Sequence, residues 1–84
     1  MEEQEVGVVV HYFGKISVGV IQLKGELQKG DTIHIKGTHD DFTQTIESMR
    51  IDYDDVEQAK DGDKIGIKVI QPVHANDKVY KVIE

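Results

Sequence analysis

The feature of this sequence that most constrains its fold is an alternation of apolar and polar residues with a period of two. It is clearest over residues 31–37 and 64–70, where isoleucine or valine alternates with polar residues or glycine. A period of two places successive side chains on opposite faces of a strand, whereas a helix requires a period near 3.6. Because long stretches of helical period are missing, the sequence predicts an all-β fold.

Six short strands are expected, separated by turns. They cover residues 6–12, 16–23, 31–37, 42–51, 64–70 and 78–83. In the first strand the even-numbered residues are expected to face the core. Breaks in the alternation predict bulges near Gly19 and near Glu47–Ser48. A small antiparallel closed β-barrel is favoured over a sandwich, since closure removes the exposed strand edges.

One segment departs from this pattern. Residues 54–60 are expected to form a short helical turn that carries Val56 and Ala59 on one side, with Asp54 or Asp55 as its cap. The whole chain of 84 residues is expected to form one domain, residues 1–84, with residues 1–4 as a disordered tail. It contains no cysteine, so packing and backbone hydrogen bonds must hold the fold.

The chain is acidic, with a net charge of −6, and the charge is concentrated. Residues 40–63 hold nine acids and only two bases. Broad binding to a phosphate backbone needs clustered Lys and Arg, so DNA is excluded as a partner and RNA is expected to bind weakly. The N-terminus is acidic and the sequence has no long apolar run, which predicts no membrane association and a cytoplasmic location.

Several segments resemble those of a known family. Residues 27–35 and 59–67 each contain a glycine followed by an acid and an alternating strand, Gly30-Asp31 and Gly62-Asp63. Residues 18–25, 46–49 and 77–82 match further strands and turns in the same order. Over residues 5–83 this pattern is similar to the second domain of translational GTPases such as elongation factor Tu, the translation-protein β-barrel.

The resemblance implies a binding module without chemistry of its own. In the tRNA carriers of this family the barrel helps to hold the aminoacylated end of tRNA, near the turn matched here by Gln22 and Lys24. This chain has one more residue in that turn and no acid there, and it lacks a GTPase domain. A freestanding, non-enzymatic module is therefore expected, docking to a translation-related protein or ribonucleoprotein. Two alternatives remain: an accessory, substrate-gripping partner of an enzyme such as a U32-type peptidase, and a direct binder of RNA ends.

Two groups of residues are the candidate partner contacts. Tyr12, Phe13, Gln22 and Lys24 are expected at one end of the barrel, where aromatic rings and a cation can contact a partner. The competing interpretation places Tyr12 in the core and Phe13 as a plug of the barrel. The acidic pair Asp54–Asp55 is expected to face a basic partner, with a solvated acidic surface as the alternative.

No catalytic residue, cofactor or metal site is predicted. The acids after residue 51 do not follow the order of a calcium-binding loop. The four histidines, His11, His34, His39 and His74, lack the spacing of a zinc site. Neither serine, Ser17 or Ser48, follows the pattern of a nucleophile elbow.

Overall fold

The computed structural model describes residues 2–83, and these residues form ten antiparallel strands and no helix. Because they contain no helix, none of them forms an apolar helix long enough to cross a membrane. The strands are β1 (Glu2–Phe13), β2 (Val18–Leu23), β3 (Leu27–Gln28), β4 (Thr32–Lys36), β5 (Asp41–Thr45), β6 (Met49–Ile51), β7 (Asp54–Asp55), β8 (Gln58–Ala59), β9 (Lys64–Lys68) and β10 (Lys78–Ile83).

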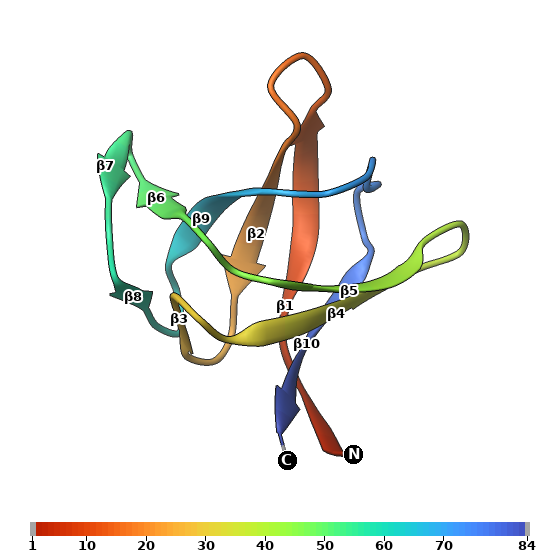
Figure 1. The fold of residues 1–84 in the computed structure, drawn as a ribbon, viewed down its shortest axis with the longest axis horizontal. Helices are drawn as coiled ribbons and strands as arrows, with labels where there is room; N and C mark the ends of the chain where they lie inside the picture. Colours follow the sequence, from red (N-terminus) through yellow and green to blue (C-terminus); the bar gives the residue numbers. More distant parts are fainter. Residues whose placement is uncertain (1, 84) are drawn as a thin grey trace.

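Eight of these strands form one sheet in the order β5-β4-β10-β1-β2-β9-β6-β7, and β3 pairs with β8 in a second, small sheet. The long strand β1 lies between the last strand, β10, and its hairpin partner, β2. Figure 1 shows the sheet curling so that β4 and β5 come to lie across one side of β1 and β2. The all-β, antiparallel class predicted from the sequence is therefore confirmed.

The predicted six-stranded closed barrel is not found. The strand expected over residues 42–51 is split into β5 and β6, which lie first and seventh in the sheet order. Between them, Ile46 exchanges backbone hydrogen bonds with a turn instead of a strand: its N–H donates to Asp31 O, and its carbonyl accepts from Gly30 N–H, each at 2.9 Å. Because the chain leaves the ladder at this point, no continuous strand joins the ladder of β4 to that of β9, and the sheet stays open.

The predicted helical turn at residues 54–60 is also wrong. Ile51 pairs with Asp54, so Asp52 and Tyr53 form a two-residue hairpin loop between β6 and β7. Their φ angles are 50° and 72°, the left-handed values that a type I′ hairpin turn requires. Ala59, expected on the helical turn, is instead buried through the pairing of β8 with β3. After this turn Asp54 and Asp55 pair with β6 as an extended strand, so they cannot begin a helical turn.

In β1 the predicted inward face is only partly correct. Its register shifts between Glu5 and Gly7 in the pairing with β10, and again between Val9 and His11 in the pairing with β2. These bulges bury Val9 and leave Val10 40% exposed, although the alternation placed Val10 in the core. The bulge expected near Gly19 is absent, because β2 alternates regularly along all six of its residues. The sequence therefore predicted a bulge in β2, whereas the structure has it in β1, the other strand of the hairpin.

The N-terminal residues do not form the disordered tail expected for residues 1–4. Glu2, Glu3 and Gln4 belong to β1 and pair with the end of β10, with Glu2 opposite Ile83. Residue 1 lies outside the described residues. Figure 1 accordingly shows the two ends of the chain side by side at the base of the sheet.

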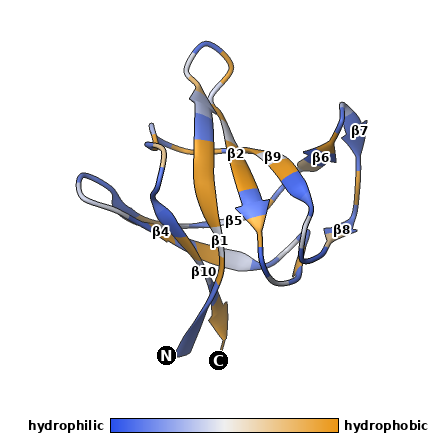
Figure 2. Ribbon diagram, turned by 180° about the vertical axis from the view of Figure 1, so that it is seen from behind, coloured by the Kyte–Doolittle hydropathy of each residue, from blue (hydrophilic) through white to orange (hydrophobic). Residues whose placement is uncertain are grey.

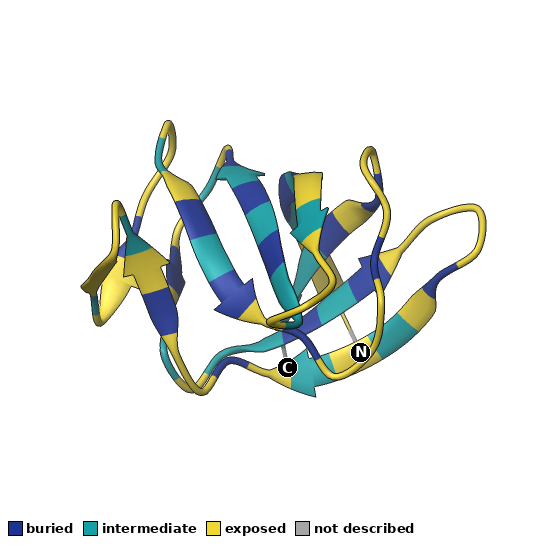
Figure 3. Cartoon of the chain, turned by 90° about the horizontal axis from the view of Figure 1, so that it is seen from above, coloured by how far each residue is buried: buried dark blue, intermediate teal, exposed yellow. Residues whose placement is uncertain are grey.

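A single apolar core fills the curled sheet. Figure 2 shows apolar stretches on β1, β2 and β9, and Figure 3 shows buried residues in bands along the strands, with exposed or half-buried residues between them. The bands are the inward face that the alternation predicts. The core consists of Val6, Val9, Ile21, Leu23, Leu27, Ile33, Ile35, Ile46, Met49, Ala59, Ile65, Ile67, Val69, Val73 and Val79.

Candidate functional site

An open groove of about 560 Å³ lies on the outer face of β2, β9 and β6. The strand registers place Val20, Gly66 and Arg50 side by side across its floor, because Gly66 pairs with both of the others. Gly66 has no side chain, so the floor is low at the middle of this row, and a Cβ at this position would lie 3.3 Å from Val18 Cγ1. The glycine therefore contributes to the depth of the groove between larger residues.

Exposed apolar side chains form the rim of the groove. Phe13 is 48% exposed and Ile16 is 60% exposed, both at the turn that joins β1 to β2. Tyr53, at the tip of the β6–β7 hairpin, is 95% exposed. Tyrosine is unusual at a φ of 72°, which glycine or asparagine adopts more easily. A strained backbone that presents a fully exposed ring points to a contact made by that ring.

Two cations lie along the groove. Lys64 and Lys68 begin and end β9, and both side chains point outward, on the same face as Gly66. Neither forms an ion pair with any residue in the described range 2–83. They lie four positions apart along the strand, a distance of about 13 Å at about 3.3 Å per residue. Arg50, by contrast, is already paired, with its Nε 3.0 Å from an oxygen of Asp55.

The structure does not assemble the first predicted contact. Phe13 lines the groove, while Tyr12 is half-buried and packs against the core, as the competing interpretation placed it. Gln22 and Lys24 lie at the opposite end of β2, because Phe13 pairs with Val18 at its start. The Gln22 side-chain amide donates to Gly62 O at 3.3 Å, and Lys24 Nζ lies 2.6 Å from a Glu5 oxygen. These two residues thus hold neighbouring segments together, away from the groove.

The second predicted contact lies beside the groove. Asp54 and Asp55 are exposed on β7, directly after Tyr53, and Asp55 holds Arg50. Sequence reasoning did not single out Tyr53, Lys64 or Lys68, because the acids around residue 53 were considered only as a contact for a basic partner or as a solvated surface. The signal in the sequence was Tyr53 itself, an aromatic residue between acids, because a purely solvated acidic surface does not require an aromatic ring.

A second hollow is a weaker candidate. It has a volume of about 360 Å³ and lies over β3 and β8. Its lining combines both signs of charge with a few apolar atoms, and it holds none of the large exposed apolar side chains of the described residues. Binding sites for other molecules are usually apolar hollows with a few polar groups. The groove over Gly66 fits that description better.

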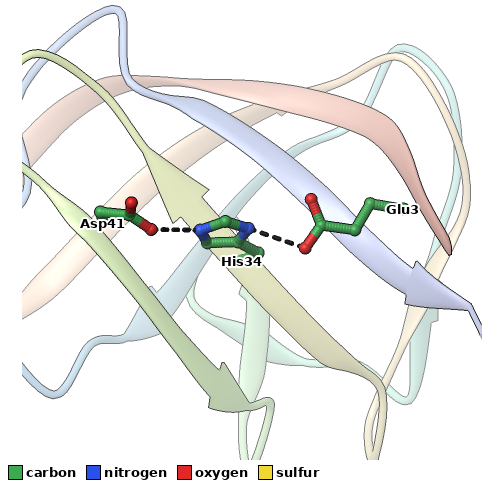
Figure 4. Close-up of polar contacts among 3 residues, drawn as sticks. All are labelled: Glu3, His34 and Asp41. Atoms are coloured by element: carbon green, nitrogen blue, oxygen red, sulfur yellow. Dashed lines mark hydrogen bonds and ion pairs between the residues drawn. The ribbon is translucent and has the colours of Figure 1, made fainter. Parts of the chain in front are cut away.

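One polar cluster ties the N-terminal strand to the far side of the sheet. His34, on β4, lies between two carboxylates, with Glu3 of β1 on its Nδ1 side at 2.7 Å and Asp41 of β5 on its Nε2 side (Figure 4). The hydrogen bond to Asp41, and then that to Glu3, raise the pKa of His34 against the opposing effect of burial. His34 in turn lowers the pKa of Asp41. This cluster stabilises the sheet and lies apart from the groove.

Comparison with known proteins gives relatives among proteases. No family model matches the chain. An uncharacterized protease of Methanocaldococcus jannaschii is 41% identical over 81 residues, which are 95% of this chain and 20% of the relative. A collagenase of Porphyromonas gingivalis is 36% identical over 78 residues, 90% of this chain and 22% of the relative. The chain therefore spans about a fifth of the length of these curated relatives.

Solved structures share the fold. The C-terminal domain of a Geobacillus thermoleovorans protein provisionally named a U32 peptidase superposes with a TM-score of 0.89, covering 95% of this chain and 93% of that one at 20% identity. Its selenomethionine variant gives a TM-score of 0.87 at the same identity, covering 90% of this chain and 96% of that one. At this identity the likeness establishes the fold alone.

These findings correct the family expected from the sequence. The relatives are a protease and collagenases, and the similar structures come from a U32 peptidase domain, so the assignment to a translation-factor barrel is wrong. Nothing among them connects the chain to translation. The alternative of an accessory domain for a U32-type peptidase is the one that they support.

Proposed function

We propose that this chain is a non-catalytic accessory domain of a U32-type peptidase and that it holds polypeptide substrate in the groove over Gly66. The observation that carries this proposal is the groove itself, on a domain whose relatives include proteases. Its lining combines apolar side chains with Lys64 and Lys68, besides the Arg50 that pairs with Asp55 and one acid, Asp52.

The spacing of the charges defines the class of ligand. An extended peptide advances about 3.3 Å per residue, so carboxylates four residues apart would meet Lys64 and Lys68 together. Apolar side chains between these acids would lie over Val20 and the hollow at Gly66. The groove therefore suits an extended segment with two acids that flank apolar residues.

The rim residues add affinity. Phe13 and Tyr53 offer flat rings on either side of a ligand, and buried aromatic contacts dominate the energy of many interfaces. The hairpin places the Tyr53 ring at its tip, where it is 95% exposed. A ligand that covers this ring would gain apolar contact.

The test is calorimetric titration of the chain with a capped peptide that carries two aspartates four positions apart, with leucine and valine between them. The double variant Lys64→Glu/Lys68→Glu is expected to weaken binding by at least about tenfold, because it turns two attractions into repulsions. Lys36→Glu, an exposed lysine on β4, serves as the matched control and should bind as the unchanged chain does.

Three outcomes would contradict the proposal. One is equal binding by the double variant and the control. Another is cleavage of the peptide by the chain alone, which would make it catalytic. The third is tighter binding of a single-stranded RNA hexamer than of the peptide at physiological salt, which would favour the RNA-binding alternative.

A further inference from the structure

Two connections far apart in the sequence meet in a cluster of metal-binding side chains. Asp40 lies between β4 and β5, and His74 and Asp77 lie in the connection from β9 to β10. One ligand atom from each residue lies within 4.8 Å of the other two. Asp40 is 7% exposed and Asp77 is 4% exposed, while His74 lies at the surface. The cluster lies outside the groove, and no part of it belongs to the proposed peptide site.

The backbone holds these side chains in place. His74 N–H donates to Asp77 Oδ2 at 3.0 Å, and Asp77 N–H donates to His74 O at 3.1 Å, which closes a tight turn. Val9 of β1 binds the same turn through its backbone. Its N–H donates to Asp77 O at 2.8 Å, and its carbonyl accepts from Asn76 N–H at 2.7 Å. Gly37 leaves the space that the Asp77 carboxylate fills. The Asp77 carboxylate is thus held by a backbone N–H before any ligand arrives.

Two carboxyl groups and an imidazole converge at one point in this cluster. Asp40 and Asp77 are both buried, and one oxygen of each lies within 4.8 Å of the other and of a ring nitrogen of His74. His74 Nδ1 lies 2.7 Å from Asp40 Oδ2, so the imidazole and one carboxylate are already in direct contact. Imidazole nitrogen and carboxylate oxygen are ligand types that zinc takes in proteins.

We propose that Asp40, His74 and Asp77 bind one divalent transition-metal ion, for which Zn²⁺ is the best match. Zinc accepts imidazole nitrogen and carboxylate oxygen at about 2.0–2.2 Å, so its tetrahedral ligands stand about 3.3 Å apart. Ligand atoms that all lie within 4.8 Å of one another reach this spacing by small rotations of the Asp40 and His74 side chains, while the Asp77 carboxylate keeps its backbone bond.

A second imidazole lies near the cluster without belonging to it. The ring centroids of His39 and His74 are 5.8 Å apart, but the ligand atoms that lie within 4.8 Å of one another come from Asp40, His74 and Asp77. The His74 imidazole favours zinc over calcium or magnesium, which prefer oxygen ligands. The bound ion would join the β4–β5 loop to the connection before β10, and its role would be structural.

The experiment is titration of the EDTA-treated, dialysed chain with zinc chloride, followed by calorimetry and by thermal unfolding. The expected result is one ion per chain and a rise in Tm with zinc. His74→Gln alters an exposed side chain, so the variant should still fold. It should lose at least about tenfold in zinc affinity, whereas His34→Gln, outside the cluster, should bind zinc as the unchanged chain does.

Three results would overturn the proposal. The first is no zinc heat and no change of Tm in the unchanged chain, which would show that the cluster holds no ion. The second is equal zinc binding by His74→Gln and His34→Gln, which would place the ion at other surface groups. Tighter binding of calcium than of zinc would likewise contradict the assignment of the imidazole as a ligand.

Discussion

His34 Nδ1 lies 2.7 Å from a carboxylate oxygen of Glu3, a residue 31 positions earlier in the chain. The other ring nitrogen faces Asp41, so both nitrogens meet carboxylates. This arrangement favours the doubly protonated imidazole, in which both nitrogens donate. The first residues of β1 are therefore attached to β4 and β5 by a titratable side chain, across the intervening strand β10.

Stability should consequently depend on pH through His34. Its pKa in the folded chain is raised above the ordinary value of 6.5. The stabilisation is therefore fully present below about pH 6.5 and is lost as the pH rises through the higher folded pKa. Urea unfolding at about pH 5.5 and about pH 8.5 should give a larger free energy of unfolding at the lower pH. His34→Gln should lose this contribution while the exposed variant His11→Gln keeps it, and equal profiles for all three proteins would refute the assignment.

Replacing Tyr53 by glycine should stabilise the fold. The left-handed φ of 72° strains a tyrosine backbone but not a glycine, and relief of such strain contributes about 1 kcal/mol. Because the ring is 95% exposed, almost no packing is lost. The midpoint of urea unfolding should rise while affinity for the acidic peptide falls. A variant with reduced stability would show that the ring supports the hairpin, against its proposed role in binding.

Gly37→Ala should be strongly destabilising. An added Cβ would collide with the carboxylate of the buried Asp77, which its backbone bonds hold in place. A collision with a fixed group costs more than ordinary overpacking, so a loss of at least about 2–3 kcal/mol is expected in chemical unfolding. Gly14→Ala, whose Cβ would lie 3.6 Å from the Tyr12 ring, is the control and should change stability little. Similar losses in the two variants would contradict the argument.

Gln44 should stabilise an exposed edge of the sheet. Its side chain donates to Lys68 O at 2.8 Å and accepts from Ile70 N–H at 2.9 Å, so it joins β5 to the end of β9. Gln44→Ala removes both hydrogen bonds and should cost about 1–2 kcal/mol, measured as a lower midpoint of thermal unfolding. Gln58→Ala, at an exposed position on β8, provides the comparison and should leave the midpoint unchanged.

Sequence reasoning succeeded where a strand alternates cleanly. β4 and β9 begin and end within one or two residues of their expected bounds, because each has buried residues that alternate with more exposed ones. It failed in β1, where two bulges shift the inward face within a run of valines that fits either phase. It failed again at residues 52–53, since Asp-Tyr is not a usual sequence for a type I′ turn.

The candidate sites depend on strand pairing, which the sequence alone does not specify. Phe13, Tyr53 and Lys64 come from separate hairpins and meet only because β2 pairs with β9 and β9 with β6. In the same way, Asp40 meets His74 across 34 positions of the chain. The spacing of residues along the chain does not show which strands pair. Sequence motifs therefore predict neither the groove nor the cluster, although all of their residues can be read in the sequence.

The pairing of the two ends of the chain has a consequence for folding speed. Glu2 lies opposite Ile83, so the β1–β10 ladder forms only after almost the whole chain has been brought together. The β1–β2 hairpin, closed by a short turn, can form within about 1–10 μs, whereas folds with many long-range pairings need milliseconds to seconds. We expect Val79→Ala to accelerate unfolding and leave refolding almost unchanged in stopped-flow measurements, because β10 joins the sheet last.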